Sequence, residues 1–178
     1  MTEDDADPDT PASGDTTTAD DVTPPAEGDL TDARDFLQYH IDEHGFLSWL
    51  GVTVDEVEQD RMVMTIPYDE KLTNSGPGSG DGSDGRNTIN GGVAATLIDS
   101  CGGMAVRASL EDPIYSGVAT IDLNVSYLRP AKGDLTATAE VVRIGGTVGV
   151  SKVSVVSETD DGEQEVAVGR GSFRIFNP

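Results

Sequence analysis

The sequence predicts an α+β domain in which an antiparallel β-sheet wraps one long, apolar helix. The stretch "GGVAATLIDSCGGMAV", residues 91–106, is glycine, small or apolar almost throughout. Four strand-like runs follow it, at roughly 115–128, 135–143, 148–157 and 163–176, with turn residues between them. One buried helix followed by a meander of strands favours a sheet that packs around the helix.

The first 30 residues are predicted to be a disordered acidic tail, and residues 31–178 the folded domain. Residues 1–30 are mostly Asp, Glu, Thr, Pro, Ala and Gly, with no lysine or arginine. Such a segment cannot bury enough apolar surface to offset the entropy of ordering. A solubilising or partner-binding role for this tail is left open.

A first helix is expected from Thr31, which is a good N-cap before an acidic turn, with Phe36, Leu37 and Ile41 at helical spacing. Gly45 is expected to end that helix, and "FLSWL" to form a short apolar turn that reaches the core. In "VTVDEVEQDRMVMTIPY", apolar and polar residues alternate, which indicates a β-hairpin.

A glycine-rich loop, "NSGPGSGDGSDGRN", spans residues 74–87. It is not predicted to be a phosphate-binding loop, because it lacks the Gly-Lys-Ser/Thr ending and no strand runs straight into it.

The charge of the chain excludes one class of partner. Acidic residues number 33 against 11 basic, so the formal net charge is -22. Such a chain repels nucleic acid and anionic membrane surfaces, so neither is an expected partner. Acidic surfaces with little lysine resemble those of proteins from extreme halophiles, where molar salt shortens the Debye length to about 3 Å.

The cellular location is expected to be the cytoplasm. Cys101 is the lone cysteine, so no internal disulfide is possible. No apolar run is long enough to span a bilayer, and the start "MTEDDADPDT" is unlike a cationic signal peptide.

The central helix carries one carboxylate, Asp99. A helix that is apolar all round is expected to be buried all round, and a buried carboxylate without a partner is costly. No lysine or arginine lies three or four residues away. Asp99 is therefore hydrogen-bonded by Thr96 or Ser100, lies at a subunit contact, or is held in a cleft for chemistry.

The start of this helix has the features of a carbonyl-binding site. Asn90 is the expected N-cap, and Gly91 and Gly92 leave the first helical amides uncovered. Those N–H groups, with the positive end of the helix dipole, can polarise a carbonyl oxygen, as acyl transfer requires. Alternatively, the glycines only allow the loop to pack closely.

Distance separates these two features. From Gly91 to Asp99 the helix rises roughly 12 Å, which is too far for both to act on one carbonyl. Two antiparallel helices across a two-fold axis would solve this, because each would give its N-terminus to one site and its Asp99 to the other. A catalytic site here therefore predicts an obligate dimer.

Three stretches, "NGGVAATLIDSCGGMAV", "VATIDLNVSYLRPAKGDLTATAEVVRIGGTVGVSKVSV" and "DGEQEVAVGRGSFRI", resemble the hotdog-fold thioesterases of the phenylacetic-acid-degradation (PaaI-type) group. The resemblance covers residues 46–178. In that family a His-Gly-Gly motif opens the central helix, and an acidic residue nine positions after the His does the chemistry. The resemblance implies that Gly91 N–H polarises the thioester, that Asp99 of the other subunit is base or nucleophile, and that Thr120 helps to hold the attacking water.

The chain departs from this family pattern at two positions. Asn90 replaces the family His, so proton sharing is lost although its amide can still donate a hydrogen bond. Gly146 stands where many members carry a basic residue. A further polar residue, usually Asn, lies about six positions before the family His; here that offset falls on Asp84, and Asn74 or Asn87 could serve instead.

Four further residues are candidates for binding the substrate: Gly92, Arg129, Lys132 and Arg143. The three cations are candidate contacts for coenzyme A phosphates, and the alternative is that they are solvated or paired with acids. No metal or other cofactor is expected, since His40 and His44 have no metal-like companions and are expected to have surface or packing roles. Cys101 is expected to be a small buried residue.

The sequence thus predicts an acyl-coenzyme A thioesterase that is a homo-oligomer, either a dimer or a dimer of dimers. Activation of water by Asp99 and direct attack through an anhydride are both open, and the acyl group is not identified. A hotdog hydratase would need a histidine that this helix lacks. A non-catalytic acyl-coenzyme A-binding protein is the main alternative.

Overall fold

The computed structural model describes residues 30–74, 87–159 and 162–176. The predicted tail up to Asp29 lies outside the described residues, as does most of the glycine-rich loop, Asp84 included. The elements in chain order are α1 (Leu30–Asp42), α2 (Gly45–Leu50), β1 (Thr53–Glu58), β2 (Arg61–Ile66), a short 3-10 helix η2 (Glu70–Leu72), α3 (Gly91–Ala108), β3 (Gly117–Tyr127), β4 (Leu135–Ile144), β5 (Val148–Thr159) and β6 (Gly162–Phe176).

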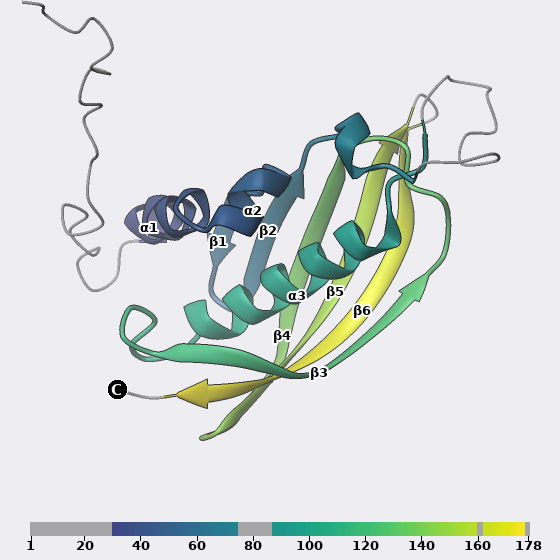
Figure 1. The fold of residues 1–178 in the computed structure, drawn as a ribbon. Coiled ribbons are helices and arrows are strands. Elements are labelled where there is room, and N and C mark those ends of the chain that lie inside the picture. Colours follow the sequence, from purple (N-terminus) through teal and green to yellow (C-terminus); the bar gives the residue numbers. More distant parts are fainter. Residues whose placement is uncertain (1–29, 75–86, 160–161, 177–178) are drawn as a thin grey trace, which may run out of the picture.

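The expected architecture is confirmed. Six strands form one antiparallel sheet in the order β1-β2-β4-β5-β6-β3, and α3 crosses one face of the curved sheet (Figure 1). The predicted hairpin is β1–β2, and the four predicted strands are β3 to β6. Within the described ranges, no helix combines the length and apolarity needed to cross a bilayer.

One local prediction was wrong. The "FLSWL" segment is not a turn but part of the short helix α2. Gly45 does not end the first helix, which stops at Asp42, but is the first residue of α2. The side chain of His44 caps this helix by accepting a hydrogen bond from Leu47 N–H, and Gly51 ends it in the left-handed region at φ 73°. The helix buries Leu47 and Leu50, so it contributes to the core as expected.

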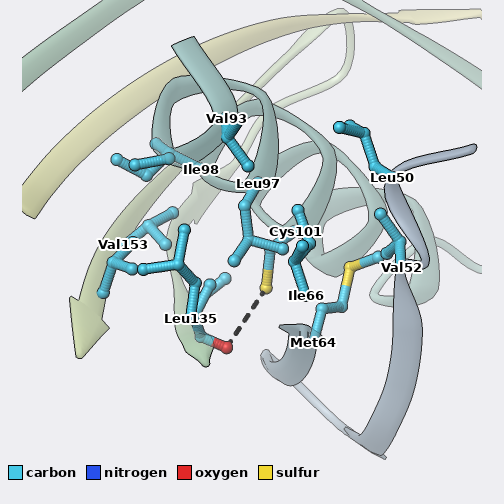
Figure 2. Close-up of a cluster of buried hydrophobic side chains, with 14 of the residues drawn as sticks. Leu50, Val52, Met64, Ile66, Val93, Leu97, Ile98, Cys101, Leu135 and Val153 are labelled. Atoms are coloured by element: carbon cyan, nitrogen blue, oxygen red, sulfur yellow. Dashed lines mark hydrogen bonds between the residues drawn. The ribbon is translucent and has the colours of Figure 1, made fainter. Parts of the chain in front are cut away.

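The main core lies between α3 and the sheet. Leu97, Ile98 and Cys101 on α3 are fully buried against residues of β2, β4 and β5, such as Met64 and Leu135 (Figure 2). Burial of each such aliphatic side chain contributes about 1.5–3 kcal/mol. Cys101 is a small buried residue, as predicted, and its thiol donates weakly to backbone carbonyls of β2 and β4.

Two glycines allow α3 to approach the sheet closely. A Cβ atom on Gly102 would lie 2.6 Å from Ser151 Oγ and 3.3 Å from Phe173. A Cβ on Gly103 would lie 3.1 Å from the same ring. The middle of the helix therefore rests on β5 and β6, with no room for a methyl group at Gly102 and only a tight fit for one at Gly103.

The prediction that α3 is buried all round is wrong for a single chain. Gly92 is exposed, and Thr96, Asp99 and Ser100 are half-exposed on the side of the helix that the sheet does not cover. The sheet buries only one side of the cylinder, so the carboxylate of Asp99 keeps access to solvent.

Candidate active site

Asn90 caps α3, as predicted, and both ends of its carboxamide are engaged. Asn90 Oδ1 accepts a hydrogen bond from Gly92 N–H at 2.8 Å, and Asn90 Nδ2 donates to Asn74 Oδ1 at 2.7 Å. The two bonds fix which end of the amide is which, since one atom must accept and the other donate. The expectation of an uncovered Gly92 amide is wrong, because the N-cap side chain takes that N–H.

Gly91 has a different environment. Its N–H has no hydrogen-bond acceptor among the described residues. Its carbonyl accepts a hydrogen bond from the Tyr127 hydroxyl at 3.0 Å, and a Cβ on Gly91 would lie 3.1 Å from the Tyr127 ring. Glycine thus permits close packing against Tyr127, and because Gly91 is the first residue of α3, its N–H has no acceptor within the helix and can bind one outside it.

A hollow of about 350 Å³ opens beside this helix start. Ligand pockets typically have volumes of about 300–1,000 Å³ and pair an apolar lining with a few polar groups. The lining residues include Asn90, Gly91 and Tyr127, together with Asn74, Ala94, Leu128, Arg129 and Ala131. We call Asn74, Asn90, Gly91 and Tyr127 the amide half-site.

The candidate cations are placed differently from one another. Arg129 lines the hollow, and its guanidinium donates to the carbonyl of Glu165 at 2.8 Å. Lys132 follows three residues later in the chain; it is half-buried and does not line the hollow. Arg143 is exposed on β4, directly opposite Val150 of β5, and is not brought to the amide half-site.

A second cluster lies further along α3. Thr120 Oγ1, on β3, donates a hydrogen bond to Asp99 Oδ1 at 2.7 Å. Thr96 instead donates to the carbonyl of Gly92, so it does not cap Asp99. Thr120 is exposed and Asp99 half-exposed, so this pair can be reached from solvent. We call Asp99 and Thr120 the carboxylate half-site.

The two half-sites do not meet within one chain. Helix α3 is unbroken from Gly91 to Ala108, so Asp99 lies roughly 12 Å along the axis from Gly91. A carbonyl bound at the first half-site is therefore out of reach of the carboxylate of the same chain.

Two residues of the amide half-site were not assigned from the sequence. Asn74 was one of three candidates for the further polar residue, and only the structure pairs it with Asn90. Asn87 instead contacts the Tyr68 hydroxyl through its backbone. Tyr127 carried no signal at all, because it reaches Gly91 across 36 residues of chain.

The histidines lie away from both half-sites. His40 Nδ1 lies 2.9 Å from the carbonyl of Phe36 in its own helix, and His44 caps α2. In the part of the chain that the structure describes, no group of three or more His, Cys, Asp or Glu side chains is arranged to hold a metal ion.

Comparisons with known proteins find matches over most of the chain. A family model described as "Thioesterase superfamily" matches residues 86–163. A Halobacterium salinarum protein named "Putative esterase" is 56% identical over 151 residues, which cover 83% of this chain and 95% of its own length. Mouse "Acyl-coenzyme A thioesterase 13" is 26% identical over 128 residues, covering 71% of this chain and 81% of its own length. The crystal structure of zebra fish thioesterase superfamily member 2 superposes with a TM-score of 0.65 at 27% identity, covering 82% of this chain and 96% of that one.

Proposed function

The chain belongs to the thioesterase superfamily and has its hotdog fold, and from this premise we propose that it is an acyl-coenzyme A thioesterase whose active site is shared between two subunits. The superfamily to which the chain belongs, and the esterase and thioesterase names of its relatives, support the assignment of the chain as a hydrolase. The observation that carries the proposal is the pair of half-sites on one helix: an amide N–H with no acceptor among the described residues at Gly91, and a hydrogen-bonded carboxylate at Asp99.

The amide half-site would bind the thioester carbonyl. Gly91 N–H, at the positive end of α3, would donate to the carbonyl oxygen as negative charge develops on it. Asn90 Oδ1 is occupied by Gly92 N–H, so the side chain of Asn90 can offer only the second Nδ2 hydrogen. Asn90 would therefore act as a donor and not as a base.

The carboxylate half-site would attack that carbonyl. Thr120 holds Oδ1 of Asp99, which leaves Oδ2 to take a proton from water or to attack the carbonyl carbon itself. In either route the C–S bond breaks, the thiol leaves with a proton, and one water supplies the oxygen of the product acid. A hydroxyl beside the carboxylate also suits the positioning of that water.

The proposed dimer follows from the distance between the half-sites. A two-fold axis that sets two α3 helices antiparallel would place Asp99 and Thr120 of one subunit against Asn90 and Gly91 of the other. Two complete sites would result, and a lone chain would have none. The proposal extends to a dimer or a dimer of such dimers.

The substrate class rests on relatives and on chemistry. Mouse acyl-coenzyme A thioesterase 13 is named for that substrate. Arg129 at the rim of the hollow could meet a phosphate of coenzyme A, with Lys132 near it in the chain. We place the chain in the PaaI-type group on the motif pattern around Asn90, Gly91 and Asp99.

The direct test compares wild type with Asp99→Asn on a panel of acyl-coenzyme A thioesters in multimolar KCl. Loss of a general base or nucleophile should lower kcat by about 100-fold or more while the oligomer stays intact. Asp122→Asn is the matched control, because Asp122 is an exposed carboxylate on the same strand as Thr120. Equal kcat for wild type and Asp99→Asn would refute the proposal.

Sharing of the site is tested by mixing two inactive variants. Gly91→Ala would put a Cβ 3.1 Å from the Tyr127 ring and so displace the helix start, while Asp99→Asn removes the carboxylate. The two variants damage different half-sites, so a mixed dimer would hold one intact site out of two. Random mixing makes half of the dimers mixed, so activity should recover to about a quarter of wild type. If each chain carries its whole site, mixing after unfolding and refolding recovers nothing.

A non-catalytic acyl-coenzyme A-binding protein is the alternative, and the engaged carboxamide of Asn90 favours it, because no proton-sharing group stands at the helix start. Such a protein would bind acyl-coenzyme A but hydrolyse none of the thioesters in the panel. Its Asp99→Asn variant would bind acyl-coenzyme A as tightly as wild type.

We also propose that the protein works at molar salt. Its net charge of -22 makes self-repulsion strong at low ionic strength, and a close relative comes from Halobacterium salinarum. Raising KCl from about 0.1 M to about 1 M shortens the Debye length from about 10 Å to about 3 Å. The free energy of unfolding should rise over that range, and a flat or falling dependence would contradict this.

A further inference from the structure

A second hollow lies at the C-terminal end of α3, the end opposite to the amide half-site. There the chain turns from α3 into β3, whose start pairs with the end of β6 (Figure 1). The volume of this hollow is about 550 Å³, within the range of about 300–1,000 Å³ that is typical of small-molecule pockets. Ser109, at its edge, lies roughly 15 Å along the helix axis from Asp99. The proposed thioesterase chemistry therefore makes no use of this hollow.

One wall of the second hollow is apolar and is formed by Leu110, Ile144 and Ile175. Ile175 is buried, and Leu110 packs against the same small core cluster. Ile144 lies opposite Gly149, where a Cβ would meet Val106 of α3, so Ile144 faces the helix side of the sheet. The wall can therefore cover an aliphatic segment of a ligand.

The rim of the second hollow is acidic. Glu111 is exposed and Asp112 half-buried, and neither forms an ion pair with any residue that the structure describes. Asp112 Oδ1 accepts a hydrogen bond from Tyr115 N–H at 3.1 Å, which leaves Oδ2 open. Arg107 does not line the hollow, because its guanidinium donates to two backbone carbonyls of the following loop at 2.7 and 2.9 Å. The negative end of the α3 dipole adds to the charge of the two carboxylates.

A buried hydroxyl without a partner also lines this hollow. Ser116 is 4% exposed, and its N–H donates to the carbonyl of Asp112 at 3.1 Å. Its Oγ has no hydrogen-bond partner among the described residues. Ser109 differs, because its hydroxyl donates to the carbonyl of Ala105. Since buried polar groups in native proteins are normally hydrogen-bonded, the open Ser116 hydroxyl points to a ligand that completes it.

The charge and size of the second hollow define the class of ligand. The carboxylates repel an anion, and a neutral ligand would displace their water without replacing its interactions. A bare inorganic cation would fill little of about 550 Å³, since one water takes about 30 Å³, and would leave the apolar wall uncovered. An alkyl ammonium group instead has three donors for carboxylate and hydroxyl oxygens, and a methylene stem that packs along apolar surface.

We propose that the second hollow binds a free alkyl diamine or polyamine. One ammonium group would lie between Asp112 Oδ2 and Ser116 Oγ. The methylene stem would run along Leu110 and Ile175, and a second ammonium group would reach Glu111 at the rim. This binding requires neither thioester hydrolysis nor the shared active site, so it stands or falls independently of the proposed function.

The binding test uses calorimetry on the full chain with 1,4-diaminobutane and spermidine in about 1 M KCl. The Debye length is then about 3 Å, so attraction of an amine to the overall charge of -22 is screened and binding requires direct contact. The double variant Glu111→Gln/Asp112→Asn should bind both amines at least about tenfold more weakly, because charge-assisted hydrogen bonds are lost. Asparagine keeps the Oδ1 that accepts from Tyr115. No saturable binding by wild type, or equal affinity in the variant, overturns the proposal.

Ser116→Ala tests the hollow without changing any charge. The affinity for both amines should fall about threefold or more, because a hydrogen bond to the ammonium group is lost. The melting temperature without amine should equal or exceed that of wild type, since the hydroxyl has no partner among the described residues. Unchanged affinity in Ser116→Ala would mean that the amines do not enter the hollow, and it would overturn the proposal.

Glu158→Gln/Glu163→Gln is the matched control for charge. Glu158 and Glu163 lie directly opposite each other on β5 and β6, both are exposed, and neither lines the hollow. This variant removes the same two charges as the first double variant and should bind the amines within twofold of wild type. An equal loss of affinity would mean that net charge alone attracts the amines, which contradicts a specific site.

Ammonium chloride is the matched control for the methylene stem. The ammonium ion carries the same donors but cannot cover the apolar wall, so it should bind at least about tenfold more weakly than 1,4-diaminobutane. Equal affinity for the two would show a site for a simple cation and would overturn the assignment to alkyl amines.

Discussion

The hydroxyl of Thr120 donates a 2.7 Å hydrogen bond to Asp99, joining the edge strand β3 to the middle of α3 across 21 residues of chain. A register shift in the β3–β6 pairing lies just after Thr120, between it and Asp122. The bond gives the carboxylate a definite orientation on the side of α3 that the sheet leaves open. Its effect on catalysis can be measured without disturbing the core, since Thr120 is exposed.

Thr120→Val should lower kcat about tenfold or more, because valine has nearly the same shape but cannot donate to the carboxylate. A hydrogen bond to a charged group contributes about 1.5–3 kcal/mol. Thr120→Ser keeps the donor and should retain most of the activity. Steady-state kinetics on an acyl-coenzyme A substrate check this, and full activity in Thr120→Val would show that the bond has no role in turnover.

Tyr127→Phe should lower kcat/KM several-fold and the free energy of unfolding by about 1 kcal/mol, because the bond from its hydroxyl to the Gly91 carbonyl is lost. Tyr115→Phe is the control, since Tyr115 is 70% exposed and its hydroxyl makes no hydrogen bond to the described residues. Kinetics and urea unfolding of the two variants should differ. Equal behaviour would mean that Tyr127 does not position the helix start.

Gly102→Ala should destabilise the protein by about 1–3 kcal/mol, because the new methyl group would overlap Ser151 Oγ. Ser151→Ala should be neutral or stabilising, since this buried hydroxyl has no hydrogen-bond partner among the described residues. In the double variant the new methyl group no longer overlaps an oxygen. Its loss of unfolding free energy should therefore be smaller than the sum of the changes in the two single variants. Urea unfolding of all four proteins completes the cycle, and strict additivity would contradict the close contact.

Burial raises the pKa of the Cys101 thiol from 9.0 to about 12. The folded protein therefore keeps a proton that the unfolded chain releases above about pH 9. The stability that this thiol contributes is complete below that pH and is lost as pH rises toward about 12, with a slope of up to about 1.4 kcal/mol per pH unit.

The Cys101→Ala variant should lack the pH-dependent loss of stability that the thiol causes. Urea unfolding at about pH 8.5 and about pH 10.5, on either side of the thiol's ordinary pKa, should show a steeper loss of stability for wild type than for the variant. The difference between the two proteins cancels the titration of other groups. Parallel slopes would mean that the thiol ionises equally in both states.

Most of the secondary structure could be predicted because it depends on neighbours a few residues apart. Alternation with period two marked the strands, and the cap at Asn90 marked the start of α3. Helix α2 was missed because His44, an unusual N-cap, supplies the local acceptor that starts it. The burial of α3 was overestimated because composition describes how apolar a helix is, not how many of its sides one chain can cover.

The candidate site was predicted only in part. Asn90, Gly91 and Asp99 lie on one helix, so their spacing along the chain already sets their separation of roughly 12 Å. The choice of Asn74 over Asn87, and the contact of Tyr127 with Gly91, depend on chain segments that meet from 16 and 36 residues apart.

The sequence by itself determined the elements, the capped helix and the eight-residue step between the glycine and the carboxylate, since these follow from local hydrogen bonding and periodicity. Tertiary structure alone decided that Asn74 orients Asn90 and that Arg170 faces Lys152. The reason is strand register: a shift of one residue would turn every side chain of a strand to the other face, and no local pattern encodes which distant residue ends up opposite.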